Sequence, residues 1–394
     1  MALYAGILAS FSQSPAPDTS AYITYNPRKL RFEEVNFVSS YYIQDGNHAS
    51  VTGGLGTQEL TDFANVIDVK VYTYDRKNRK HQFNLGCGID NYSSASSDMI
   101  DLSANSSASS SDMRVYPSLT WLSTNEKKGL SYGAGLYFST EYDYKSFGAE
   151  ATFGKKTSNR NGELNLKLQV YLDQVKLIYP VELRHAGADD IDLSKPSEAR
   201  NSYSMAASWS QEINPRLQVL ISAEIIQQSG FLSLPFHRVY FTDQSVHAEK
   251  LPDMRLKIPL GLRLSYFLGD RIIMRLFYRY YTDDWNLSSN TAGVEIPVKL
   301  NTFFSISPFY RFYAQHAARY FSPYETHEHG VDFYTSNYDL SQFTSHFMGA
   351  GLRYTPLHGL FGLKYLNMIE VRYGLYDRSD GLKSSIVSLN LLLK

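Results

Sequence analysis

The sequence predicts an all-β protein, a transmembrane antiparallel up-and-down β-barrel of about 16 strands. Three observations predict it. Segments that alternate polar and apolar residues recur along the chain, the links between them are alternately short and long, and the apolar face of a segment carries no charge. A membrane-spanning barrel needs all three features, because each strand faces lipid on one side and the barrel interior on the other.

Composition agrees with a barrel and excludes other classes. The 394 residues contain no apolar run near the ~20 residues of a transmembrane helix. Tyr (31) and Phe (22) are abundant, as expected where a barrel wall meets water. Lys and Arg (38) balance Asp and Glu (39), so the strong basic excess of a nucleic-acid binder is missing. The single cysteine, Cys87, has the parity of its apolar neighbours and is interpreted as a small lipid-facing residue.

Three segments organise the chain. Residues 1–13 resemble the apolar core of a secretory signal without its basic start, which favours a truncated signal remnant over a buried helix. Residues 14–29 are expected to form an N-terminal periplasmic segment. Residues 30–394 then form one outer-membrane barrel domain.

Period-two alternation predicts sixteen strands, an even number as in bacterial barrels. They are residues 30–43, 66–74, 81–90, 114–122, 130–144, 147–153, 163–177, 201–212, 217–228, 254–267, 271–282, 291–299, 303–313, 344–354, 367–376 and 383–392. The last strand is expected to pair with the first and to close the barrel.

The connections predict an orientation. Links after even strands are mostly short and polar, whereas several links after odd strands are long, namely 44–65, 91–113, 178–200, 229–253 and 314–343. Short turns belong to the periplasm and long loops to the outside, so both termini are expected in the periplasm. A soluble β-sandwich could show the alternation but has no reason to alternate its loop lengths.

The two faces of single strands sort by charge. In 163–173 the leucines and Val170 occupy one parity, while Glu163, Lys167 and Asp173 occupy the other. A charge facing mid-membrane lipid would cost ~2–4 kcal/mol, so the charged parity is expected to face the lumen. The same rule places these candidate solute-facing residues inside: Arg255, Lys257, Arg263, Arg271, Arg275, Arg279, Arg311, Glu163, Glu224, Glu370 and Arg372.

Two interpretations of these lumenal charges stay open. A cationic wall opposite acidic residues such as Asp68, Asp173 and Glu295 would set a transverse field that selects solutes by charge. The same residues could instead form a salt-bridged network that fills or stiffens the interior. The sequence does not say which charges meet.

Two long loops contain possible metal ligands. His316, His327 and His329 lie in the loop 314–343 beside several carboxylates, and His-x-His suits Zn²⁺, Cu²⁺ or Ni²⁺. Solvated histidines are the favoured interpretation. In the loop 91–113 the acidic residues Asp90, Asp98, Asp101 and Asp112 could bind Ca²⁺, although a small-residue loop packed over the lumen is preferred.

Other motifs argue against an enzyme. The glycines of 45–62 lack the Gly-Lys-Ser/Thr ending and the helix of a phosphate-binding loop, so a folded outer loop is favoured. No nucleophile elbow or His-Glu-x-x-His is present in the sequence. A hydrolase assembled across strands is therefore the third and least favoured function.

Several stretches carry a family resemblance that covers nearly the whole mature chain. They are 38–42, 45–48, 60–62, 93–98, 235–241, 277–281 and 307–311. With them the chain resembles a Gram-negative, Bacteroidota-type outer-membrane β-barrel family that is catalogued only as a domain of unknown function. The resemblance implies gene neighbours such as a small lipoprotein and a flavin-attaching enzyme, and hence envelope redox or metal physiology, but it assigns no residue a role.

The leading hypothesis is a porin-like channel or transporter for small polar or charged solutes, integral to the outer membrane. Its expected partners are outer-membrane lipid and a small solute. The alternative is a closed-barrel scaffold or receptor in an envelope complex, with a lipoprotein as a partner. No resident cofactor and no nucleic acid are expected, and a divalent metal in the outer loops is a side hypothesis.

Overall fold

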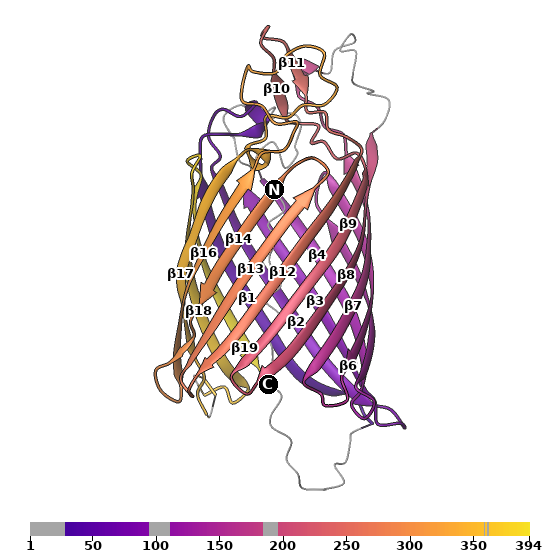
Figure 1. The fold of residues 1–394 in the computed structure, drawn as a ribbon, viewed down its shortest axis with the longest axis vertical. Helices are drawn as coiled ribbons and strands as arrows, with labels where there is room; N and C mark the ends of the chain where they lie inside the picture. Colours follow the sequence, from indigo (N-terminus) through magenta and orange to yellow (C-terminus); the bar gives the residue numbers. More distant parts are fainter. Residues whose placement is uncertain (1–27, 94–110, 184–195, 358, 361) are drawn as a thin grey trace.

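The computed structural model describes residues 28–93, 111–183, 196–357, 359–360 and 362–394. They form a closed antiparallel barrel of tilted strands (Figure 1). The first half of its wall consists of β1 (Arg31–Asp45), β2 (Leu60–Tyr74), β3 (Lys80–Ser93), β4 (Ser111–Asn125), β5 (Leu130–Thr140), β6 (Tyr144–Lys156), β7 (Gly162–Lys176), β8 (Ser197–Asn214) and β9 (Leu217–Gly230).

The second half of the wall follows a small hairpin of β10 (Arg238–Tyr240) and β11 (Val246–Ala248) that lies outside the wall. It consists of β12 (Met254–Leu268), β13 (Ile272–Asp283), β14 (Ser288–Glu295), β15 (Val298–Lys299), β16 (Phe304–His316), β17 (Phe343–Tyr354), β18 (Leu366–Arg378) and β19 (Lys383–Leu393). β14 and β15 are two halves of one strand, because both pair with β13 and β16. The wall therefore contains sixteen strands, each of which is one crossing from one end of the barrel to the other, as predicted.

Each predicted segment corresponds to one crossing, and the differences lie at the ends. β2 begins six residues before the predicted start. The prediction missed these residues because Asp62 and Ala64 face the interior and lack the apolar character of a membrane strand. The predicted strand 291–299 is interrupted at Pro297, which has no N–H for the ladder. The predicted strand 130–144 ends at Thr140, and a tight turn follows it.

The last strand closes the barrel. β19 pairs with β1 from Val35↔Leu393 to Asp45↔Lys383, while β1 pairs with β2 on its other side. Closure gives every wall strand two neighbours, so the barrel sheet of the described residues has no free edge. The predicted pairing of the last strand with the first is confirmed.

The two ends of the barrel differ. One end, called here the long-loop end, has the connections 46–59, 231–253 and 317–342, and the hairpin of β10 and β11 rises above it (Figure 1). The other end, the short-turn end, has tight turns such as 75–79 and 126–129. Among the described residues no helix is long and apolar enough to cross a membrane. The 3₁₀ helices η1 (Ser50–Thr52), η3 (Val181–Leu183) and η4 (Tyr338–Leu340) are single turns.

The outer face of the wall is apolar and exposed. Leu168, Met205 and Ile221 are 56%, 58% and 56% exposed on the successive strands β7, β8 and β9, and Leu172 and Ile225 repeat the pattern. Cys87 shares this outward parity, opposite Ile67 and Pro117. The buried apolar clusters of the described residues lie instead at the long-loop end, around Trp285 and Phe241. A closed barrel with an apolar exterior satisfies its backbone internally and suits lipid, so the protein is an integral outer-membrane barrel.

Candidate functional site

The interior of the barrel carries two walls of different charge. Residues with the parity opposite to the exposed apolar positions face inward. On β12–β18 the charged residues among them are mainly basic: Arg255, Lys257, Arg263, Arg275, Arg279, Arg311, Arg353, Arg372 and Arg378, beside Asp283, Glu295 and Glu370. This set is called the Arg/Lys wall.

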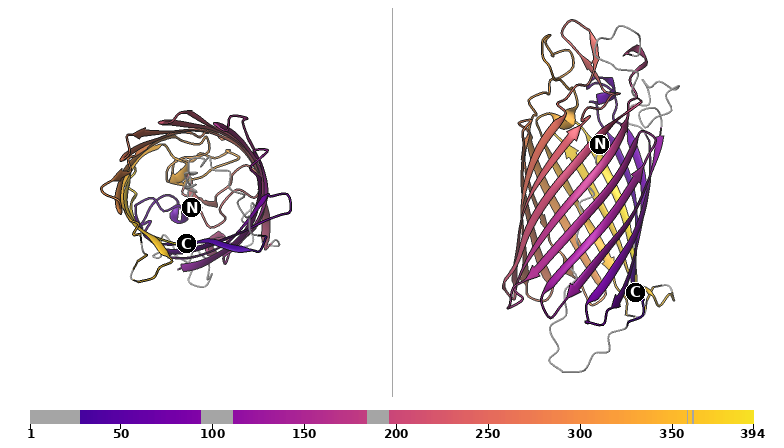
Figure 2. Two further views of the ribbon diagram at one scale, coloured as in Figure 1. Left: turned by 90° about the horizontal axis from the view of Figure 1, so that it is seen from below. Right: turned by 90° about the vertical axis from the view of Figure 1, so that its right-hand side faces the viewer.

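Strands β1–β9 have an acidic interior. Acidic residues outnumber basic ones there: Glu34, Asp62, Asp68, Asp90, Glu150, Glu163, Asp173 and Glu224, beside Lys70, Arg114, Lys167 and Arg200. This set is called the acidic wall. The strand order brings β3–β7 across the ring from the Arg/Lys wall, as the view along the barrel in Figure 2 shows.

The predicted solute-facing residues lie inward, with one exception. Arg271 precedes β13 and is exposed in the turn at the short-turn end, where its backbone oxygen accepts a hydrogen bond from Lys299. It therefore belongs to the rim and not to the wall, because the chain turns before Ile272. Arg353 and Arg378 were not among the candidates, although the alternation that identified Arg275 also applies to them.

A chain of five charged groups lies in the Arg/Lys wall toward the short-turn end. Glu370 accepts from Arg353 at 2.7 Å and from Arg372 at 3.1 Å. Arg372 also reaches Glu295 at 2.9 Å, and Glu295 accepts from Arg275 at 3.2 Å. The alternation of positive and negative groups compensates the Glu370 side chain, which is only 5% exposed.

Arginines of the same wall lie over phenylalanine rings. The guanidinium of Arg263 lies 5.5 Å from the Phe277 ring centroid, and that of Arg311 lies 5.6 Å from Phe347. Phe347 in turn packs against Phe309 at 5.1 Å. A cation over a ring face is attracted by the ring quadrupole and loses side-chain freedom. The rings therefore keep these arginines along the wall.

Tyrosines accompany the carboxylates of the acidic wall. Tyr116 donates to Asp90 at 2.7 Å, and Tyr144 donates to Asp173. Glu150 pairs with Lys167 at 2.9 Å. At Asp90 and Asp173 the tyrosine hydroxyl groups satisfy the carboxylates without adding positive charge, which preserves the acidic excess on this side of the interior.

The interior retains space for solvent beside the charged residues. Arg275 and Arg353 have side chains 50% and 47% exposed, and Lys167 on the acidic wall is 37% exposed. Side chains that face inward and still contact solvent show that the charged network does not fill this part of the interior.

Three loops form a cap over part of the long-loop end. Ser50 donates to Asn337 at 3.0 Å, which joins the loop 46–59 to the loop 317–342. Arg238 of the hairpin loop 231–253 donates to the backbone oxygen of Val51 at 2.7 Å. η4 lies within the ring of strands when the barrel is viewed along its length (Figure 2). The cap thus extends from above the barrel into its mouth.

Buried polar contacts hold the cap together. Glu249, with a side chain 1% exposed, accepts from the Leu234 backbone at 2.7 Å and from the Thr335 hydroxyl at 2.5 Å. Its other neighbour is the His237 ring, at 3.4 Å. Gly54 adopts φ +93°, and a Cβ at this position would lie 3.0 Å from the Ser336 oxygen. The loop 46–59 therefore turns tightly against the loop 317–342. Gly53 and Gly54 thus allow close packing between the cap loops.

The wall anchors the cap at the mouth. Arg378 contacts Asp339 of η4 and Asp380, both at 2.7 Å. Gln315 donates to the backbone oxygen of Ser341 at 2.7 Å. The barrel and the cap therefore share hydrogen bonds at buried positions.

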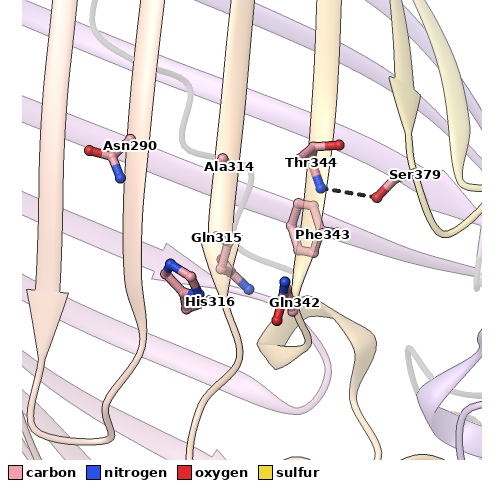
Figure 3. Close-up of a pocket in the computed structure, with 8 residues that line it drawn as sticks. All are labelled: Asn290, Ala314, Gln315, His316, Gln342, Phe343, Thr344 and Ser379. Carbon is pink, nitrogen blue, oxygen red and sulfur yellow. Dashed lines mark hydrogen bonds between the residues drawn. The ribbon is translucent and has the colours of Figure 1, made fainter.

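The candidate metal ligands of the loop 314–343 are not brought together. His327 is buried and its Nε2 lies 3.1 Å from the Thr335 oxygen, and burial lowers its pKa below the ordinary value. His329 pairs with Asp243 at 2.7 Å. His316 lines a hollow of about 250 Å³ at the outer rim, together with Asn290 and Thr344 (Figure 3). The three imidazoles have separate environments.

The calcium candidates are also divided. Asp98 and Asp101 lie outside the described residues, and Asp90 bonds Tyr116. Among the described residues, the one group of three possible ligands within reach of one another is Asp112, Glu141 and Asp143. Only Asp112 of this group was predicted, because the turn after β5 is remote from the loop 91–113 in sequence.

A family model described as "Protein of unknown function (DUF3570)" matches residues 89–379. The chain belongs to this family. No curated protein sequence matches this chain.

Solved structures of similar overall shape are distant. A bacterial polysaccharide outer membrane secretin has 11% identity and a TM-score of 0.44, with 91% of this chain and 98% of that chain covered. OccD3 (OpdP) from Pseudomonas aeruginosa has 9% identity and a TM-score of 0.43, with 94% and 92% covered. The siderophore receptor PirA from Acinetobacter baumannii has 11% identity and a TM-score of 0.46, with 87% covered, but this family member spans only 53% of that receptor. These values assign no function.

Proposed function

We propose that the protein is a porin-like channel or transporter that passes small polar or charged solutes across the outer membrane. The observation that carries the proposal is the solvent-accessible interior between the Arg/Lys wall and the acidic wall. Opposed walls set a transverse field that orients a dipolar solute and separates ions by sign. The function is passage and selection, without catalysis and without a resident cofactor.

The proposal includes an orientation. The long-loop end faces the outside and both termini lie in the periplasm, because short turns are periplasmic in barrels of this type. Labelling of intact cells with a membrane-impermeant maleimide tests it in a Cys87→Ser background. Ser245→Cys in the hairpin loop should react and Lys127→Cys in a short turn should not. The reverse pattern would contradict the orientation.

Ion selectivity in planar bilayers tests the channel. The wild type should conduct, and Arg275→Ala and Arg279→Ala should each move the reversal potential toward cation selectivity, because each removes one positive charge from the wall. Lys127→Ala removes an equal charge from an exposed turn outside the lumen and serves as the matched control. A wild type without conductance, unchanged in the arginine variants, would refute the channel.

A second function is favoured by the cap. Loops that close part of the mouth through buried contacts suit a closed scaffold or receptor of an outer-membrane complex, with a lipoprotein as partner. In that case conductance stays absent and a partner copurifies in fixed ratio from native membranes. Purification without any stoichiometric partner would contradict this alternative.

A further inference from the structure

We infer that Arg263 and Arg311 bind small organic carboxylates inside the barrel. The inference deepens the proposed function, because it names the solute class that the Arg/Lys wall takes. It concerns one row of inward-facing residues across five strands, from β12 to β17 through β13, β14 and β16.

The backbone register sets this row. Arg263 lies opposite Phe277, and Phe277 lies opposite Gly293. Gly293 in turn lies opposite Arg311, and Arg311 lies opposite Phe347. Neighbouring strands are ~4.8 Å apart, so the two arginine backbones are separated by roughly 14 Å. Gly293 interrupts the wall between them, and a Cβ built there would meet its nearest heavy atom only at 3.5 Å.

The two arginines differ from their neighbours in charge balance. Arg275, Arg353 and Arg372 each have a carboxylate within 3.2 Å. Of the described acidic residues, none forms an ion pair with Arg263 or Arg311. Two positive charges of the wall therefore have no ion-pair partner among the described residues, and a solute anion can supply the opposite charge.

The rings select the shape of that anion. Each of the two guanidinium groups lies over a phenylalanine face, at 5.5 and 5.6 Å. A ring face takes up none of the in-plane N–H donors, so their edges stay available for an acceptor. Arg311 is also exposed to the interior solvent. A planar fork of donors matches a carboxylate in a bidentate contact, and the adjacent rings favour an apolar body.

Saturation-transfer NMR with benzoate tests the inference on the whole protein in detergent, without reference to conductance. Benzoate should bind the wild type, and benzamide, which has the same planar body and no charge, should not. Arg263→Gln and Arg311→Gln should each weaken benzoate binding about tenfold to a hundredfold, the range expected for a lost charged hydrogen-bonded contact.

Arg353→Gln is the matched control, because it removes one lumenal charge that already has a carboxylate partner. It should change benzoate binding less than threefold. Equal binding of benzamide, unchanged binding in the two variants, or an equal loss in Arg353→Gln would each overturn the inference. Benzoate binding to a protein that does not conduct would refute the channel alone, and conductance without benzoate binding would refute the carboxylate site alone. Heat-dependent gel mobility of every variant establishes that it is folded.

Discussion

A single pair of neighbouring residues tests the assignment of the two barrel faces. Leu168 lies midway along β7, points outward and is 56% exposed. The next residue, Gln169, points inward, and its Nε2 lies 2.6 Å from the Tyr171 hydroxyl. Leu168→Arg and Gln169→Arg therefore place the same new charge at nearly the same height on opposite sides of one wall.

The expected magnitudes differ because the surroundings differ. Arginine at the lipid midplane costs ~2–4 kcal/mol, so Leu168→Arg should lower the folded-to-unfolded ratio roughly thirty- to nine-hundred-fold. Gln169→Arg loses one hydrogen bond worth about 1 kcal/mol. Its new charge remains in the solvated interior near Glu150, the register partner of Gln169, which offsets part of that loss.

Equilibrium unfolding in urea, with the barrel reconstituted in lipid vesicles and followed by gel mobility, measures both costs. The reasoning requires Leu168→Arg to be the more destabilised variant by at least ~1 kcal/mol, the smallest gap between the two estimates. Equal costs, or a greater cost for Gln169→Arg, would mean that the faces are assigned wrongly or that the interior is dry.

Three further predictions concern the ion pairs and the loops. Glu370→Gln should destabilise the barrel by about 1–3 kcal/mol in the same urea assay. This is less than the cost of breaking a fully buried ion pair, because Arg353, which loses its partner, is half exposed to solvent. Burial lowers the folded pKa of His327, so its contribution to stability is complete above the unfolded value near 6.5 and is lost as pH falls through the lower folded value. Proteolysis within the cap should increase below about pH 6.5, and His327→Asn should remove most of that pH dependence. Backbone N–H groups, first that of Arg79, hold the pKa of Asp75 well below its usual range. The Asp75 carboxylate therefore stabilises the turn 75–79 above about pH 4, and this stabilisation is lost on acidification. Amide exchange should show that acidification loosens the turn in the wild type and does not loosen it further in Asp75→Asn.

The sequence by itself determined the crossings and their faces. Alternation has the same period as the side chains of a strand, so each residue's parity states its side of the wall without knowledge of any neighbour. This is why sixteen segments correspond to sixteen crossings, and why Arg275 and Arg311 were identified as inward residues. The alternation did not indicate the interruption at Pro297, where the predicted strand 291–299 is divided into β14 and β15.

Only the tertiary structure decided which charged groups meet. Glu295 and Arg372 are 77 residues apart and lie on strands separated by two others, so their 2.9 Å contact depends on barrel tilt and stagger. The cap is a stronger case, since Glu249 and Thr335 are 86 residues apart in loops without any period. Periodicity reports the environment of a residue, whereas a contact between remote segments depends on how the closed barrel brings them together. For this reason the sequence predicted a charged lumen, while the structure separated the arginines that have a carboxylate partner from Arg263 and Arg311.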